Sequence, residues 1–302
     1  MLDNFRPMSS TPTVLIAGCG FLGLEIARQF RHRGWRVFGL TRTAGSAREA
    51  ANATGIEPLV ADLTDPGALR SAAKSSPHFH AVVHCAGTGG GSVDDYRRVY
   101  AEGSRHLAEV LAPDTLFFTS STSVYRQIDG TVVDETSLAG VGTAKAEILA
   151  QAEQTVLGHG GLVARLAGIY GPGRSALLRK FLHQQAILED GGGKWINQIH
   201  RDDAASAIVH LITMPDRRAA LFNVCDNEPL TQHRIYEGLA SYFSRPIPPH
   251  GPRDTSRKRG WTDKRVSNAR LLRTGWAPAY PSFLEAVRHD ARLTASFADT
   301  DQ

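Results

Sequence analysis

Cysteine is scarce in this sequence, with three residues in a chain of 302. Cys19, Cys85 and Cys225 lie far apart and form no C-x-x-C pair. This spacing argues against a disulfide framework and against a zinc site of the usual kind. Thiols that are few and unpaired are typical of a reducing compartment, so we expect a cytoplasmic protein.

Long apolar runs are also missing. No uninterrupted apolar segment reaches the length that spans a bilayer, and the opening segment Met1–Pro7 lacks the apolar stretch of a signal peptide. The hydrophobic fraction of 42% is nevertheless enough for an ordinary core. We expect a soluble globular protein without a membrane partner.

Neither sign of charge dominates the chain. It carries 34 Lys and Arg against 30 Asp and Glu, for a formal net charge of +4, and the two signs are mixed along it. No nucleic-acid partner is expected from such a distribution. One basic segment could bind the diphosphate of a nucleotide-linked substrate, although a solvated loop is the favoured interpretation. Its basic residues are Arg253, Arg257, Lys258, Arg259, Lys264 and Arg265.

Two sets of histidines invite a functional interpretation. The first set lacks a carboxylate or cysteine to complete a ligand sphere, so we predict no bound metal. The second set precedes residues 204–213 and could be catalytic, but acidic residues there also cap a helix N-terminus, which we favour. The sets are His78, His80 and His84, and His200 with Asp202 and Asp203.

The most informative segment runs from Val14 to Gly23, where an apolar run ends in glycines spaced G-x-G-x-x-G. Gly18 allows a tight turn after a strand, Gly20 lets the backbone approach a pyrophosphate, and Gly23 lets the next helix pack closely. The N-terminus of that helix would present unpaired N–H groups to the anion. The segment therefore predicts a dinucleotide phosphate site.

The residues that follow agree with this interpretation. Leu22, Ile26 and Phe30 recur at helical spacing. Gly34 stands where a helix would end in the left-handed conformation, and Trp35–Leu40 is apolar enough for a second strand. A strand, a turn, a helix and a second strand together take about 30 residues here, which is the expected size of a βαβ unit.

Strand-like runs continue to alternate with segments of helical period. This alternation predicts an α/β fold with a doubly wound parallel sheet of the Rossmann type. The carboxyl ends of parallel strands meet at one edge, so the residues directly after each strand are candidates for a site. The expected strands are Pro58–Ala61, Ala81–His84, Thr115–Thr119 and Leu162–Leu166, and the expected helices are Tyr96–Leu111 and Thr143–Leu157.

The regular alternation weakens from about Gly171 onward, where prolines and charges accumulate. We expect a dinucleotide-binding core over residues 10–170 and a smaller substrate-side region over residues 171–302. No Gly/Ser-rich or Pro-rich tether separates the two, so we expect them to be partly intertwined.

Further segments carry a family resemblance. In chain order they are Ala61–Asp65, Phe118–Tyr125, Arg165–Gly173, His200–Asp203, Phe222–Val224 and Leu272–Pro278. Together with the glycine turn, they resemble the extended short-chain dehydrogenase/reductase family, also called the NAD-dependent epimerase/dehydratase family. The similarity covers nearly the whole chain. It implies an adenine contact at Asp62 and a catalytic serine at Ser121.

The sequence departs from the family at one position. Members that transfer hydride carry Tyr-x-x-x-Lys on the helix after the serine strand, with the ammonium beside the phenol. Here Lys145 is present and Val141 stands where the tyrosine would be. The resemblance implies that Lys145 still positions the nicotinamide ribose. Because a valine cannot move a proton, we predict that Tyr125 does so beside Ser121. In the alternative interpretation, Tyr125 is a packing residue.

The cofactor is predicted from the end of the second strand. NAD-binding proteins usually place an acid there for the ribose 2′-hydroxyl, whereas an arginine accommodates a 2′-phosphate. Because Thr41 and Arg42 follow this strand, NADP(H) is favoured over NAD(H). The predicted cofactor-binding residues are Gly18, Gly20, Phe21, Leu22, Gly23, Thr41, Arg42, Asp62, Leu63, Ala86 and Lys145.

Two functions follow from these observations. The first is an NAD(P)-dependent oxidoreductase, epimerase or dehydratase that acts on a small, carbohydrate-like or nucleotide-linked substrate, a class that the resemblance implies. The second is an NAD(P)-binding regulatory or scaffold protein that has lost hydride transfer. This hypothesis is motivated by Val141, which stands in place of the family tyrosine. The helices at Tyr96–Leu111 and Thr143–Leu157 could also pair across a two-fold axis, as in many relatives, so a homodimer is a further hypothesis.

Overall fold

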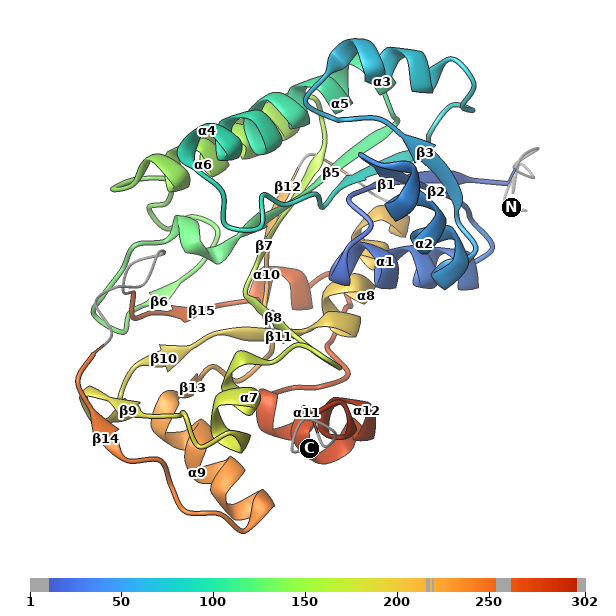
Figure 1. The fold of residues 1–302 in the computed structure, drawn as a ribbon. Coiled ribbons are helices and arrows are strands. Elements are labelled where there is room, and N and C mark those ends of the chain that lie inside the picture. Colours follow the sequence, from blue (N-terminus) through green and yellow to red (C-terminus); the bar gives the residue numbers. More distant parts are fainter. Residues whose placement is uncertain (1–10, 216–217, 219, 254–261, 298–302) are drawn as a thin grey trace, which may run out of the picture.

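The computed structural model describes residues 11–215, 218, 220–253 and 262–297. A seven-stranded sheet runs through the molecule in the order β12-β7-β5-β4-β1-β2-β3, and every neighbouring pair is parallel (Figure 1). The strands are β1 (Thr13–Ala17), β2 (Arg36–Thr41), β3 (Glu57–Val60), β4 (Ala81–His84), β5 (Thr115–Ser121), β7 (Leu162–Leu166) and β12 (Ala220–Val224).

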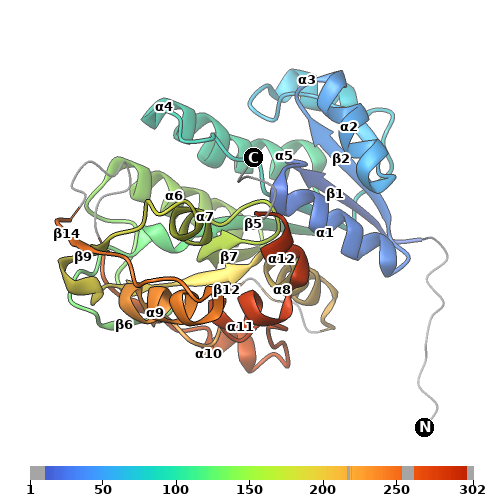
Figure 2. The same cartoon turned by 60° about the horizontal axis from the view of Figure 1, so that its bottom comes forward.

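Helices cover both faces of this sheet (Figures 1 and 2). Every residue of β1 is buried, as expected of a central strand with packing on both sides. One layer contains α1 (Phe21–His32), α2 (Ala44–Thr54) and α8 (Arg201–Thr213), and the other contains α3 (Pro66–Ala73), α5 (Gly103–Leu111) and α6 (Ala144–Gly158). The predicted doubly wound parallel sheet is confirmed.

Local sequence explains where α1 and its neighbours begin and end. The apolar positions of α1 are buried against the sheet, and the chain leaves the helix through Gly34 at φ +77°. The second predicted helix starts earlier than expected, because Ser92 and Asp95 form a capping box for α4 (Val93–Tyr96). A π-helical turn, η1 (Arg97–Glu102), then joins α4 to α5.

The strand order reverses between β1 and β4. From β1 the chain moves outward through β2 and β3, and after α3 it returns to the other side of β1 and continues through β4, β5 and β7. Crevices outside the carboxyl ends of the strands form at such a reversal, and ligands of α/β proteins bind there. The fold thus places the glycine turn after β1 beside the loop after β4.

The chain after residue 171 is not a detached unit. Its strand β12 extends the main sheet beside β7, and its helix α8 packs on α1. The rest forms a smaller layer with a separate apolar cluster that includes Tyr170, Phe181, Tyr236 and Phe283. Its helices are α7 (Ala176–Leu182), α9 (Gln232–Phe243), α11 (Phe283–His289) and α12 (Ala291–Ala295), whereas α10 (Ala269–Leu272) packs on β12 of the main sheet.

Short strand pairs hold this smaller layer and its connections together. The parallel pair β8–β11 extends from β7 into the smaller layer, next to the cavity described below (Figure 1). The strands are β6 (Val132–Val133), β8 (Gly168–Tyr170), β9 (Leu188–Glu189), β10 (Trp195–Ile196), β11 (Gln198–His200), β13 (Leu230–Thr231), β14 (His250–Gly251) and β15 (Arg265–Val266), and the short turns are η2 (Thr122–Val124) and η3 (Asp190–Gly192). None of the helices in the described ranges has the length and apolar content needed to cross a membrane.

Candidate functional site

A cavity of about 970 Å³ opens at the carboxyl ends of β1, β4, β5 and β7. Its size is at the upper end of the range for small-molecule sites, about 300–1,000 Å³. The predicted strand-end segments after these four strands meet in its wall, and residues 194–197 with Thr262 and Lys264 close it from the smaller layer. The cavity therefore lies between the sheet edge and the C-terminal region.

The three glycines of the turn after β1 have different surroundings. Gly18 has φ +108°, and a Cβ on it would lie 2.4 Å from the backbone nitrogen of Ala86. A Cβ on Gly23 would lie 2.0 Å from the carbonyl oxygen of Gly18. Gly20 lines the cavity and has no atom within 4 Å of the place where its Cβ would stand. Gly18 and Gly23 are thus required by packing, whereas Gly20 leaves room for a ligand.

The N-terminus of α1 faces this open space. No side chain caps the helix at Gly20, and its first turn contains no acidic residue. The guanidinium of Arg174 lies 5.2 Å from the Phe21 ring, and that of Arg201 lies 5.0 Å from it. A helix N-terminus with uncapped N–H groups and nearby positive charge is suited to a pyrophosphate.

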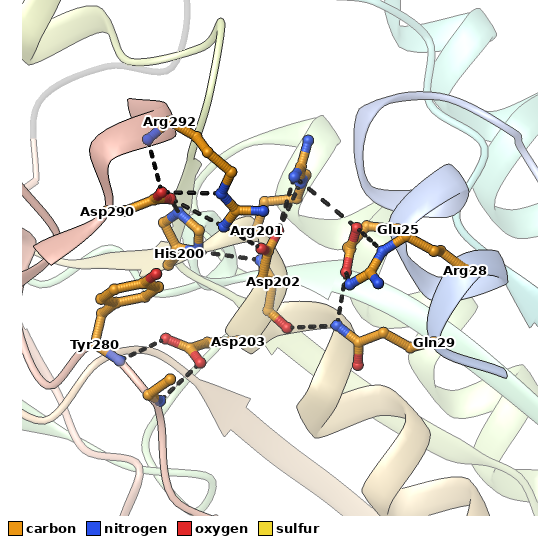
Figure 3. Close-up of polar contacts among 11 residues, drawn as sticks. Glu25, Arg28, Gln29, His200, Arg201, Asp202, Asp203, Tyr280, Asp290 and Arg292 are labelled. Atoms are coloured by element: carbon orange, nitrogen blue, oxygen red, sulfur yellow. Dashed lines mark hydrogen bonds and ion pairs between the residues drawn. The ribbon is translucent and has the colours of Figure 1, made fainter. Parts of the chain in front are cut away.

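A polar network holds α1 and α8 together behind this turn (Figure 3). Glu25 on α1 accepts from Arg28 at 2.6 Å, and Gln29 donates to the carbonyl oxygen of Asp202 at 3.0 Å. Arg201 and Arg292 each lie 2.8 Å from the Asp202 carboxylate. Burial acts to raise the pKa of Asp202, but the bonds from the two arginines outweigh it and the pKa is lowered. The C-terminal region thereby fixes the helix that carries the glycine turn.

The cap of α8 differs from the expectation. His200, rather than an acidic residue, caps the helix, because its Nδ1 accepts from the backbone N–H of Asp202 at 3.2 Å. Asp203 turns the other way and accepts from the backbone N–H groups of Ala279 and Tyr280 at 2.8 and 3.0 Å (Figure 3). The predicted cap by the acids is therefore wrong, and the two acids join α8 to the C-terminal region instead.

The predicted cofactor residues divide into two groups. Gly20, Phe21, Leu22, Gly23 and Ala86 line the cavity, and Gly18 lies behind them against Ala86. The second group lies at the carboxyl ends of β2 and β3, outside the cavity lining; it consists of Thr41, Arg42, Asp62 and Leu63. The remaining predicted cofactor residue, Lys145, is described below.

The two charged members of this second group have different surroundings. Arg42 is exposed, and Asp62 accepts from the backbone N–H and hydroxyl of Thr64 at 2.9 and 2.8 Å.

Ser121 and Tyr125 are not brought together. Ser121 lines the cavity, and its hydroxyl accepts from the backbone N–H of Ser123 at 3.2 Å. Tyr125 is fully buried and does not line the cavity. Its hydroxyl accepts from Arg165 at 2.8 Å and has acceptors at Asp134 and Asn223 within 2.9 Å.

Burial also raises the pKa of Tyr125. The Tyr125 hydroxyl is thus bonded inside the core and lies outside the cavity lining, which favours the alternative interpretation of Tyr125 as a packing residue over the predicted proton transfer. Arg165, which donates to it, also forms a buried ion pair with Glu153 at 2.6 Å.

Lys145 and Val141 also differ from the expected pattern. Helix α6 starts at Ala144 after the Thr143 cap, so residue 141 lies in the preceding loop, where its side chain is 41% exposed. Lys145 donates to the carbonyl oxygen of Gly91 at 2.7 Å, and its Nζ lies 4.6 Å from the centre of the Tyr96 ring. Tyr96 lines the cavity, whereas Lys145 stands behind it.

The cavity is lined by a cluster of cations, of which only Lys264 belongs to the basic run singled out in the sequence. Arg126, Lys194 and Lys264 line it together with Arg174, and none of its described lining residues is Asp or Glu. Burial, with repulsion from Arg126 and Lys194, lowers the pKa of Lys264 to about 8. Its ammonium donates to the carbonyl oxygen of Tyr125 at 3.0 Å. Arg126, Lys194 and Lys264 come from segments far apart in the chain, so only the fold brings them together.

The remaining sequence candidates lie elsewhere. His78 pairs with Asp114 at 2.8 Å on the surface, His80 bonds Thr13, and His84 is buried beside Ser104. No cluster of His, Cys, Asp or Glu within the described residues could hold a metal ion.

Arg253 of the basic run pairs with Asp190 at 2.7 Å. Arg257, Lys258 and Arg259 lie outside the described residues.

The geometry thus defines a Rossmann-type α/β protein with an open glycine turn at the N-terminus of α1. The family model for the NAD-dependent epimerase/dehydratase family matches residues 14–225. The chain belongs to this family.

Among similar proteins, Protein YeeZ of Escherichia coli K12 is 31% identical over 241 residues, which cover 75% of this chain and 82% of YeeZ. A candidate NAD-dependent epimerase/dehydratase of Methylobacillus flagellatus has a similar structure, with 30% identity, a TM-score of 0.72 and coverage of 95% of this chain and 99% of that one. The UDP-glucose 4-epimerase of Bifidobacterium longum, solved with NAD+ and UDP, shares the fold at 16% identity and a TM-score of 0.75, covering 94% and 97% of the two chains.

Proposed function

We propose that this protein is an NAD(P)-dependent enzyme of the oxidoreductase, epimerase or dehydratase type. The observation that carries the proposal is the open space at Gly20, in front of the uncapped N-terminus of α1. The cradle suits a pyrophosphate because backbone N–H groups face it and no described side chain comes within 4 Å of a Cβ built on Gly20. When bound, the nicotinamide supplies or accepts a hydride.

The chain's own residues have separate roles in this proposal. Gly20, Phe21 and Leu22 hold the pyrophosphate at the start of α1, with Arg174 as the nearby cation. Asp62 and Leu63 serve the adenosine at the carboxyl end of β3. Ser121 binds a substrate oxygen from the wall of the cavity, and Lys145 keeps the nicotinamide end in place through the loop at Gly91.

The proposed cofactor is NADP(H) in preference to NAD(H). Arg42 is exposed just beyond β2, where a 2′-phosphate would reach, and the hydroxyl of Thr41 donates to the carbonyl oxygen of Thr43 at 3.1 Å. A guanidinium favours the phosphate through charge-assisted hydrogen bonds.

The proposed substrate is small, polar and anionic, with a nucleotide-linked carbohydrate as the leading class. The B. longum epimerase holds UDP in the same fold. In this chain, the support is the cationic cluster Arg126, Lys194 and Lys264, in a cavity wall without a described carboxylate. Three cations beyond the pyrophosphate end would balance a phosphate or diphosphate on the substrate.

A second candidate is a dinucleotide-binding regulatory or scaffold protein. It is favoured by the exposed Val141 and the buried Tyr125, which leave no tyrosine at the family position. We further propose a cytoplasmic protein and a homodimer through the layer of α5 and α6.

Calorimetric titration with NADPH and NADH, followed by nicotinamide absorbance against sugars, nucleotide sugars and small carbonyls, separates the enzyme from the regulatory or scaffold protein. Binding with turnover supports the enzyme, and binding without any turnover favours the regulator.

A further inference from the structure

Few side chains in the cavity wall can exchange a proton with a substrate, because its described lining residues include no Asp, Glu or His. The thiol of Cys85 is already used, since it donates to the carbonyl oxygen of Gly18 at 3.1 Å. The other titratable groups are the phenols and amines of Tyr96, Tyr100, Lys194 and Lys264. Lys264 differs from the other three in burial: it is 5% exposed, whereas they are partly exposed.

The ammonium of Lys264 is held in place by two neutral oxygen atoms. It donates to the carbonyl oxygen of Tyr125 at 3.0 Å and to the hydroxyl of Thr262 at 3.2 Å. An ammonium has three N–H groups, so one is left for a ligand in the cavity. The group is thus restrained and still has a proton to give.

The charges around Lys264 favour release of this proton. Burial has the largest effect, repulsion from Arg126 and Lys194 adds to it, and attraction from Asp263 opposes it. Together they lower the pKa of Lys264 to about 8. The amine is therefore mostly protonated at neutral pH but can lose and regain its proton during turnover, as an acid and base must.

Lys264 also lies on the side of the cavity where a hydride would be transferred. Its acceptor Tyr125 follows β5 and η2 directly. Strand β5 lies two strands from β1, on the side away from β2 and β3, which is about 10 Å at the usual strand spacing. A dinucleotide with its pyrophosphate at α1 and its adenosine at β3 extends its nicotinamide in this direction.

We propose that Lys264 is the catalytic acid and base of this protein. The inference rests on the proposed function. In the direction of reduction, the carbonyl carbon of the substrate gains a hydride from the dihydronicotinamide. The carbonyl oxygen keeps the π electrons and takes the third proton of the Lys264 ammonium, which leaves a neutral amine. The amine regains a proton from the solvent, and oxidation follows the reverse path.

Lys264→Arg separates proton transfer from charge, because arginine keeps the positive charge but does not release its proton in a protein. We expect this variant to bind NADPH within about threefold of the wild type and to lose turnover by at least about 100-fold. Lys180→Arg, at an exposed lysine of α7 outside the cavity, is the matched control and keeps both. Wild-type turnover by Lys264→Arg would reduce Lys264 to a binding charge and overturn the proposal.

The pH dependence has opposite signs in the two directions of reaction. Reduction uses the ammonium, so kcat should fall as the pH rises through about 8, whereas oxidation uses the amine, so kcat should rise over the same range. Both changes should be missing from the residual activity of Lys264→Arg. If Tyr96→Phe or Tyr100→Phe removes them while Lys264→Arg keeps them, a phenol is the acid and base instead.

A second measurement does not depend on a substrate. Protein labelled with 13C at the lysine Cε atoms is titrated by NMR without cofactor, and the signal missing from Lys264→Arg identifies Lys264. We expect a midpoint near pH 8, well below the ordinary value of 10.5. A midpoint at the ordinary value overturns the role of Lys264 even if NADPH binds. A midpoint near 8 in a wild-type protein that does not bind NADPH overturns the proposed function instead.

Discussion

The two sides of the cavity follow the family pattern to different degrees. On the side of the glycine turn, Gly18 and Gly23 stand where any Cβ would meet backbone atoms, and Gly20 opens into free space. On the side of α4 and α6, Val141 is exposed in a loop and Lys145 turns to Tyr96 on another helix. Close backbone packing requires glycine at Gly18 and Gly23, whereas the exposed loop position of Val141 restricts its side chain far less.

Charges show a second contrast between regions. In the network between α1, α8 and α12, the carboxylates of Glu25, Asp202 and Asp290 each bond an arginine (Figure 3). The cavity is lined by four cations, and none of its described lining residues is Asp or Glu. Paired charges fix the position of helices, whereas a cavity wall rich in cations is suited to an anionic ligand.

The largest effect is expected from the buried ion pair that lies behind the cavity. Glu153→Ala leaves the Arg165 guanidinium buried without its carboxylate, which should lower the free energy of unfolding by about 3–5 kcal/mol. Glu285→Ala, which breaks an exposed pair with Arg288, should cost less than about 1 kcal/mol. Urea unfolding of both variants checks this, and equal losses would contradict the structural role of Arg165.

Gly20→Ala tests the glycine side directly. Because no atom lies within 4 Å of the new Cβ, the free energy of unfolding should stay within about 0.5 kcal/mol of the wild type. The methyl group would occupy the place of the pyrophosphate, so we expect NADPH affinity to fall about 10-fold to 100-fold, or about 1.4–2.8 kcal/mol. Gly158→Ala, also without neighbours, is the matched control. Unchanged affinity in a calorimetric titration of Gly20→Ala would remove the phosphate site from this turn.

The charge of Lys264 should make stability depend on pH. Its pKa is about 8 in the folded protein and 10.5 as the ordinary value, so the unfolded chain binds more protons between these pH values. Stability contributed by this group therefore rises from pH 8 to 10.5, by roughly 3 kcal/mol, and is constant below. Lys264→Met should lack this rise when both proteins are unfolded by urea across that range. Parallel pH profiles would show that the lysine is not desolvated in the folded state.

Tyr125→Phe sharpens the contrast between the core and the cavity wall. Loss of a hydroxyl that bonds Arg165 inside the core should lower the free energy of unfolding by about 1–2 kcal/mol. NADPH affinity and turnover should not change, since the side chain does not line the cavity. A loss of turnover with unchanged stability would return Tyr125 to the mechanism.

The smallest effect concerns cofactor choice. Arg42→Ala should reduce the preference for NADPH over NADH by about threefold to 10-fold, because one exposed charge pair with the 2′-phosphate is lost. Affinities for both cofactors are measured by titration at one salt concentration. A preference that is the same in variant and wild type would assign the 2′-phosphate to another residue.

The fold and one half of the site could be predicted from the sequence. The apolar run of β1, the glycine spacing and the strand ends at Ala86 and Ser121 depend on local pattern, and the structure brings them to one cavity. The position of Tyr125 could not be predicted, because being near a strand end does not tell which way a side chain points. The contact of Tyr96 with Lys145 and the cluster around Lys264 depend on packing between segments far apart in the chain.

The most direct test of the account is calorimetric titration of the wild-type protein with NADPH, alongside Gly20→Ala and Gly158→Ala. The account predicts one NADPH per chain for the wild type and for Gly158→Ala, with affinity reduced at least about 10-fold in Gly20→Ala. Absence of NADPH and NADH binding by the wild type, or equal affinity in all three proteins, would contradict it.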